Sequence, residues 1–179
     1  MKKSLIALAM MSAFSGAALA QSSVTLYGIV DVNYMWQEGP VLTGTPATIQ
    51  QKSVSAINSG HQSGNRWGLR GSEALGGGLS AIFALESGFN LDTGTLGQGG
   101  RLFGRQAYAG LSGGWGSVVA GRLATFSSGT GDFDMIGRVD PFSTGFGLAG
   151  AQNTFFSMNS LRLDNAIAYV SPTFAGFKA

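Results

Sequence analysis

Two arginines stand four residues apart in the segment RWGLRGSEALGGGLSAIFALE, residues 66–86. Arg66 and Arg70 alternate with Trp67 and Leu69, so an extended chain presents the cations on one face and apolar side chains on the other. A guanidinium stays ionised even where other cations crowd it. The chemistry that this spacing suits is therefore electrostatic, with fixed positive charge along a wet surface.

A nucleophile motif also occurs, but its surroundings do not favour catalysis. Gly110-Leu-Ser112-Gly-Gly114 fits G-x-S-x-G, in which the serine stands on a turn between a strand and a helix. The residues that follow predict a tight turn into another strand, and the single histidine, His61, precedes the serine. With no cysteine and one histidine, thiolate or imidazole metal centres lack ligands. We expect no enzymatic activity, no metal and no other cofactor.

The start of the chain has the three parts of a secretory signal peptide. Met1-Lys-Lys-Ser is positive, residues 5–14 are apolar, and Ala18-Leu-Ala20 is a small-x-small cleavage site. The apolar stretch is too short to cross about 30 Å of hydrocarbon, so residues 1–20 are expected to be removed. Both lysines of this start go with them, which leaves nine basic and nine acidic residues. Such a balance does not predict a positively charged surface that would bind nucleic acid.

The segment Val24–Trp36 (VTLYGIVDVNYMW) alternates over its whole length. Six of the seven residues on one face are apolar or aromatic, and the other face is mixed and carries Asp31. The pattern predicts one long strand, suited to a tilted membrane strand of roughly 9–11 residues with rims. Tyr34 and Trp36 would then lie in an aromatic girdle. Further strands are predicted on either side of the glycines at 76–78 and at 102–111, 117–125 and 162–171.

Connection lengths between these strands alternate as well. About thirty residues rich in Thr, Ser, Gln and Gly follow the first strand, whereas only a glycine turn separates the next two. A loop follows Glu86, and the tight turns 112–116 and 172–176 flank a long insertion at 126–161. Outer-membrane barrels place short turns on one side and long loops on the other. A compact soluble β domain seldom carries two loops of such length, so the pattern favours a membrane barrel.

Five stretches in this order carry a family resemblance: Leu26-Tyr-Gly28, RWGLRGSEALGGGLSAIFALE, LFGRQAYAGLSG, Gly121-Arg122 and RLDNAIAYVSPTFAGF. Together they resemble the Gram-negative general outer-membrane porins, of the β-proteobacterial type. The resemblance implies an all-β fold, a transmembrane antiparallel β-barrel of 16 strands, of which residues 21–179 would hold the first six to seven. We therefore expect an N-terminal fragment that closes no channel alone, because open sheet edges leave unpaired backbone groups in lipid.

The resemblance also implies a water-filled channel for passive diffusion of small hydrophilic solutes and ions. Its wall arginines correspond to Arg66, Arg70, Arg105, Arg122 and Arg162. Residues 126–161 correspond to the third loop, which folds inward and carries carboxylates, here Asp132, Asp134 and Asp140. The acidic tip usual in the family, Pro-Glu-Phe-Gly, is replaced by Asp140-Pro-Phe-Ser, which makes Asp140 the first candidate for the constriction.

The remaining expectations concern partners and individual side chains. The expected partners are outer-membrane lipid, further copies of the chain in a homotrimer, and small solutes and ions. Asp31 and Glu86 are expected on the lumen wall or rim, whereas Trp67, Phe83 and Tyr108 are expected to face lipid or a neighbouring protomer. The arginine wall predicts a preference for anions. The alternative function is that of an outer-membrane receptor or adhesin that displays long surface loops.

Overall fold

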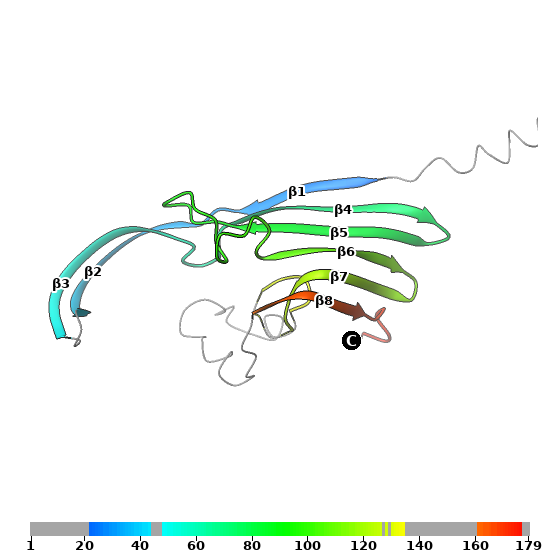
Figure 1. Ribbon diagram of the computed structural model, residues 1–179. Coiled ribbons are helices and arrows are strands. Elements are labelled where there is room, and N and C mark those ends of the chain that lie inside the picture. The colour runs from blue at the N-terminus through cyan, green and yellow to red at the C-terminus, as the bar shows by residue number, and fades with distance from the viewer. Residues whose placement is uncertain (1–21, 44–47, 127, 129, 135–160, 177–179) are drawn as a thin grey trace, which may run out of the picture.

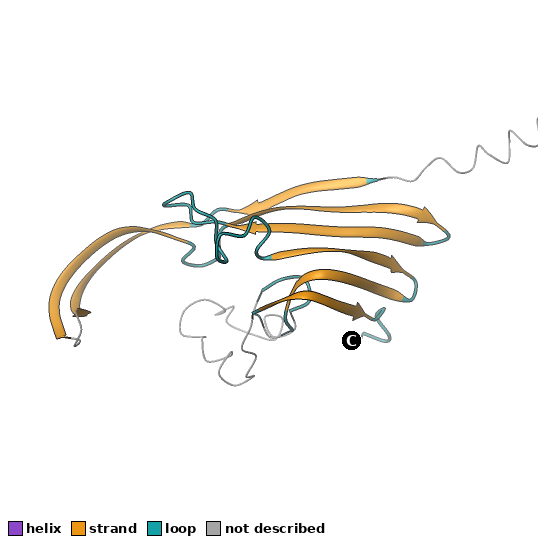
Figure 2. Cartoon of the chain, in the orientation of Figure 1, coloured by secondary structure: helices purple, strands orange, loops and turns teal. Residues whose placement is uncertain are grey.

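The computed structural model describes residues 22–43, 48–126, 128, 130–134 and 161–176. In these ranges the chain consists of strands joined by turns and loops (Figure 2). No helix among the described residues is long and apolar enough to cross a membrane. The strands are β1 (Ser23–Ile29), β2 (Val32–Thr43), β3 (Thr48–Ser59), β4 (Arg66–Gly76), β5 (Leu79–Gly88), β6 (Gln106–Gly113), β7 (Gly116–Ala124) and β8 (Arg162–Val170).

Six of these strands form one antiparallel sheet in the order β1-β4-β5-β6-β7-β8 (Figure 1). The register lines up one residue from each strand, and residues opposite one another share a face. One such row is Val24, Gly71, Phe83, Ala109, Ala120 and Ile167. This face is apolar and open, since Ile167 is 77% exposed and Leu26, two residues from Val24, is 69% exposed.

The opposite face is polar over the same strands. Arg70, Ala84, Tyr108, Gly121 and Ala166 form a row across β4 to β8. A second row contains Tyr27, Gly68, Glu86 and Gln106. The all-β fold and the alternation predicted for the hairpin at 66–86 are confirmed, with an apolar face on one side and a polar face on the other.

Short turns and long connections lie at opposite ends of the sheet, as predicted (Figure 1). The β4–β5 turn runs through Gly76, Gly77 and Gly78, with φ of +89°, +60° and +78°. Three consecutive positive φ angles favour glycine strongly, because a Cβ is strained in that region. The long connections that follow β5 and β7 leave from the other end.

The single strand predicted over 24–36 is wrong, because the chain divides it at Asp31. β1 pairs with β4 as far as Ile29, and β2 then pairs with β3 from Val32 onward. The expected loop of about thirty residues therefore contains a two-stranded ribbon, which curves away from the sheet (Figure 1). Alternation survives the break, since Val32, Tyr34 and Trp36 remain exposed on one face of the ribbon.

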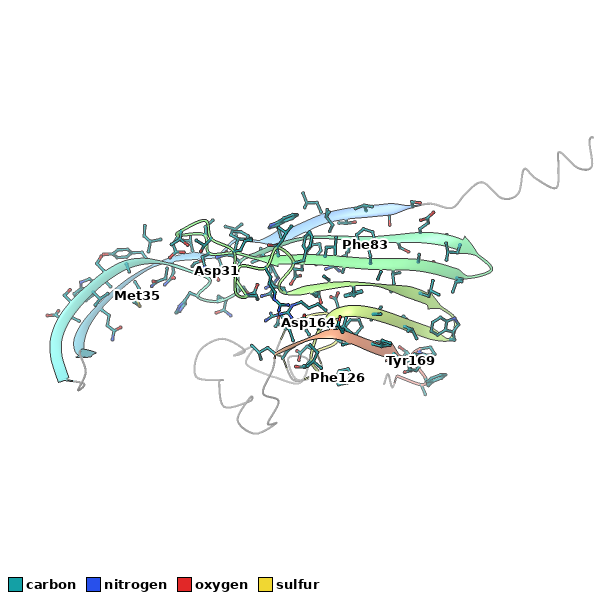
Figure 3. All side chains as sticks on the ribbon, viewed as in Figure 1. Asp31, Met35, Phe83, Phe126, Asp164 and Tyr169 are labelled. Atoms are coloured by element: carbon teal, nitrogen blue, oxygen red, sulfur yellow. The ribbon has the colours of Figure 1, made fainter. Side chains whose placement is uncertain are left out.

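Backbone amides around Asp31 explain the division. Its carboxylate accepts hydrogen bonds from the N–H groups of Gln62 (2.8 Å) and Ser63 (2.7 Å), and its carbonyl accepts one from Gly60 (2.9 Å). The Asp31 N–H donates to the Asn65 side chain, and Asp31 therefore lies outside the β1–β4 ladder. The Ser63 N–H is the main cause that lowers the pKa of Asp31. Figure 3 shows Asp31 where β1 passes into the ribbon.

The strand predicted over 102–111 also starts later, at Gln106. The segment 101–104 turns instead, although the Arg105 N–H still donates to the Glu86 carbonyl at 3.2 Å. Arg105 therefore precedes the strand, and strict alternation does not govern the direction of its side chain. The strands predicted at 117–125 and 162–171 agree with β7 and β8 to within one residue at each end.

Replacing Asp31 by alanine in the full-length protein should release the base of the ribbon. We expect amide hydrogen exchange at Gln62 and Ser63 to accelerate severalfold, because both N–H groups lose their acceptor. In the parent protein, the Gln62 and Ser63 amides should stay protected from exchange at neutral pH. This protection should be lost only as the pH falls below the ordinary pKa range of an aspartate, since the pKa of Asp31 is lowered in the folded protein. The exposed loop variant Asp92→Ala is the control, and equal exchange rates in all three proteins would contradict this account.

Candidate functional site

The polar face is built around the row of Tyr27, Gly68, Glu86 and Gln106. Gly68 makes room for Tyr27, since a Cβ at position 68 would stand 2.8 Å from the tyrosine ring. The Tyr27 hydroxyl reaches past Gly68 and donates to Glu86 Oε2 at 2.9 Å. The guanidinium of Arg70 lies 4.1 Å from the centre of the Tyr27 ring, in a cation–π contact.

A buried ion pair lies on this face toward the loop end of the sheet. Arg105 Nε lies 2.5 Å from Glu86 Oε1, and each residue is 5% exposed. Arg105 also donates through Nη2 to Thr130 Oγ1 at 2.6 Å. Because Glu86 accepts from both Tyr27 and Arg105, its charge is held between β1 and the start of β6. One buried pair thus connects the wall to the segment that follows β7.

Two cavities open on this face. One, of about 310 Å³, is lined by Tyr27, Ile29, Arg66, Arg70, Glu86, Arg105, Gln106, Thr130, Gly131 and Asp132. The other, of about 350 Å³, is lined by Ser23, Thr25, Arg70, Gly71, Ser72, Ile82, Phe83, Tyr108 and Asp132. Arg70 and Asp132 line both, so an arginine of β4 and a carboxylate of the loop lie at the boundary between the two spaces.

Four of the predicted site residues thus come together: Arg66, Arg70, Arg105 and Asp132. The lining that the described residues give these cavities contains neither Arg122 nor Arg162.

Arg122 pairs with Ala107, in the register row that also contains Leu69 and Leu85. This row alternates with the rows of Glu86 and Arg70, so the register does not place Arg122 with those two residues. Arg122 donates to the Gly104 carbonyl (2.8 Å) and pairs with Asp164 (2.5 Å), which also binds Arg101 at 2.8 Å.

The other predicted residues have local roles or lie elsewhere. Arg162 donates from Nε to the Arg105 carbonyl at 2.9 Å, which joins the start of β8 to the start of β6. Asp134 is buried, and its N–H donates to the Gly131 carbonyl. Asp140 lies outside the described residues.

The sequence prediction assigned Tyr108 to the wrong face of the sheet. It was expected to face lipid, but it shares a row with Arg70, and its hydroxyl donates to Asp132 Oδ2 at 2.6 Å. In a strand over 102–111, Arg105 and Tyr108 would point to opposite faces. Because Arg105 precedes β6, alternation does not relate the two, and both can lie on the polar face. Asp164, which binds two arginines, was also missed.

Ser112 of the nucleophile motif lies inside a ladder and not on an elbow. It is a residue of β6, paired with Ser80 on one side and Ser117 on the other. A strand, β7, follows the turn in place of a helix. The geometry that G-x-S-x-G catalysis needs is therefore missing at this serine.

Aromatic pairs mark the two ends of the sheet. Trp67 and Phe103 meet edge to face at 6.2 Å near the loop end, and Trp115 stacks on Tyr169 at 6.4 Å near the turn end. Figure 3 labels Tyr169 at that end of β8 and Asp164 toward the other. Apolar side chains lie between two aromatic girdles on the wall of an outer-membrane barrel.

Comparisons with known proteins also point to the wall of an outer-membrane barrel. The sequence pattern of the Gram-negative porin family matches residues 7–179. The chain belongs to the Gram-negative porin family. Membership confirms the resemblance and the outer membrane as the expected location.

Among similar proteins, an outer membrane porin protein of Bordetella pertussis is 43% identical over 99% of this chain and 46% of its own length. Outer membrane porin protein 32 of Delftia acidovorans is 40% identical over 100% of this chain and 48% of its own length.

A solved porin structure has the same fold. The anion-selective porin from Comamonas acidovorans superposes with a TM-score of 0.63 at 32% identity, over 88% of this chain and 45% of that one. The chain thus spans about half the length of the curated relatives it matches. Membership of the porin family favours a transport protein over an enzyme.

The buried Glu86–Arg105 pair should contribute strongly to stability. Glu86→Ala in the full-length porin leaves the Arg105 guanidinium buried without its carboxylate, which costs about 3 kcal/mol. Denaturant unfolding in detergent would measure it. The double variant Glu86→Ala/Arg105→Ala should lose less than the two single losses added together. Strict additivity would show that the two side chains do not depend on each other.

Proposed function

We propose that this chain forms part of the wall of a water-filled outer-membrane channel that passes small hydrophilic solutes and ions by passive diffusion. One observation carries the proposal: charged side chains line cavities on one face of a sheet whose opposite face is apolar and exposed. Lipid on one side and water on the other account for both faces. Family membership and the names of the relatives support the same function.

The proposed mechanism is physical and includes no covalent step. Arg66 and Arg70 project from β4, while Asp132 belongs to the loop that follows β7. Opposed fixed charges at a narrow passage create a field that orients dipolar solutes and sets the preference among ions. Side chains of the loop thus act together with those of the wall.

The charge balance supports a preference for anions. The cavity of about 310 Å³ is lined by three arginines, Arg66, Arg70 and Arg105, against two carboxylates, Glu86 and Asp132. The pair of Glu86 and Arg105 is buried and internally compensated. Arg66 and Arg70 therefore supply the excess positive charge. The similar structure from Comamonas acidovorans is named anion-selective, which agrees with this preference.

Export and assembly are part of the same proposal. Residues 1–20 act as a cleaved signal peptide, as their positive start and apolar stretch suggest. Residues 126–161 form the inward-folded loop, which is supported by the contacts of Thr130 and Asp132 with the wall. The exposed apolar face meets lipid and, in a homotrimer, neighbouring copies.

Neutralising the excess charge should move the ion preference of the full-length porin. We expect Arg66→Gln/Arg70→Gln to shift the reversal potential in a salt gradient toward cation preference, because two cations leave the cavity lining. Planar-bilayer recordings with purified protein would measure this. Arg101→Gln removes one cation from a loop residue outside both cavities and serves as the control. An equal reversal potential in the double variant and the parent would refute the assignment.

A further inference from the structure

The segment 130–134 is bound to the wall by side chains at the start of β6. Asp132 Oδ2 accepts hydrogen bonds from the Tyr108 hydroxyl (2.6 Å) and from Gln106 Nε2 (3.1 Å). Gln106 also accepts through Oε1 from the Asp132 N–H at 3.3 Å. Gln106 and Asp132 therefore form a reciprocal pair that joins side chain and backbone.

Burial shows that these contacts belong to a packed interface. Gln106 is 1% exposed although it is a polar residue on a face that water reaches. A buried amide needs partners, and Asp132 supplies both an acceptor and a donor. The Tyr108 ring packs edge to face on Phe133, with ring centres 5.4 Å apart.

The backbone of the segment approaches the wall equally closely. At Gly131, with φ of +100°, a Cβ would collide with the Ala124 side chain. Only glycine allows this approach without strain. The run Thr130-Gly-Asp-Phe thus combines an acceptor for Arg105, a small residue, a carboxylate and an aromatic ring, each matched to the wall.

We propose that Asp132 is a positioning residue, whose carboxylate holds the 130–134 segment against β6 through its hydrogen bond from the Tyr108 hydroxyl. Asp132 and Arg70 line both cavities, so the bond fixes the boundary between them. When it breaks, the segment moves from the wall and the two spaces join. The Tyr108–Asp132 bond therefore sets the frequency with which the channel visits a wider state. This inference rests on the proposed channel function.

Tyr108→Phe in the full-length porin is the direct test. The variant keeps the ring and its contact with Phe133 but removes the donor to Asp132. We expect excursions to a higher conductance in single-channel recordings to become about 5-fold more frequent, the effect of losing one typical hydrogen bond. The reversal potential should stay unchanged, because no charge is lost. Tyr169→Phe removes a hydroxyl that bonds to Trp115 at the turn end and should change neither quantity.

Variants at Asp132 separate positioning from simple charge. Asp132→Ala removes the acceptor of both Tyr108 and Gln106 and should raise the frequency of excursions at least as much as Tyr108→Phe, whereas Asp132→Asn, which keeps an oxygen acceptor, should raise it less. The double variant Tyr108→Phe/Asp132→Ala should show excursions no more often than Asp132→Ala alone, because Asp132→Ala already removes the bond to Tyr108. Thermal unfolding in detergent should confirm that each variant is folded.

Two results would count against these conclusions in different ways. Unchanged excursions in a folded, conducting Tyr108→Phe variant would overturn the positioning role and leave the channel function intact. A folded parent protein that gives no conductance steps would overturn the proposed function, and with it the inference.

Discussion

Backbone groups in lipid must find their hydrogen-bond partners within the protein, and this requirement controls the rest of the structure. The ladder pairs neighbouring strands across the six-stranded sheet from β1 to β8, with register shifts between Ala74 and Gly76 and between Gly121 and Leu123. Once the ladder is set, each side chain points either to the apolar face or to the polar face. The rows of the register, such as Arg70 with Tyr108, therefore also determine which charges and donors can meet.

Burial in this chain is reversed relative to a water-soluble domain. Among the described residues the buried hydrophobic ones are Ala84, Val119, Leu123 and Ala124, while twice as many polar ones are buried. Large apolar side chains remain open on the outer face. Where polar groups are buried, hydrogen bonds and ion pairs must replace water. The network of Tyr27, Glu86 and Arg105 thus contributes to stability and to the lining of the cavity.

Alternation in the sequence was sufficient to predict most strands of the sheet. It predicted the hairpin of β4 and β5 with its two faces, and it placed β7 and β8 to within one residue, because side-chain period is a local property. It failed at Val24–Trp36, where the alternation is unbroken but the pairing partner changes at Asp31. It failed again near Arg105, because a turn precedes β6 there and strand alternation does not relate Arg105 to Tyr108, which lies on the polar face.

The sequence by itself determined the family, through the resemblance of five stretches, and its alternation determined the β-strands and the face on which Arg66 and Arg70 lie. Only the tertiary structure decided which charges meet. Asp132 and Tyr108 are 24 positions apart in sequence, and Glu86 and Tyr27 are 59 apart, yet each pair shares a hydrogen bond. Such contacts depend on the register between strands and on where a loop returns to the wall. Neither is a local property, so the alternation that predicts a strand cannot predict its partner.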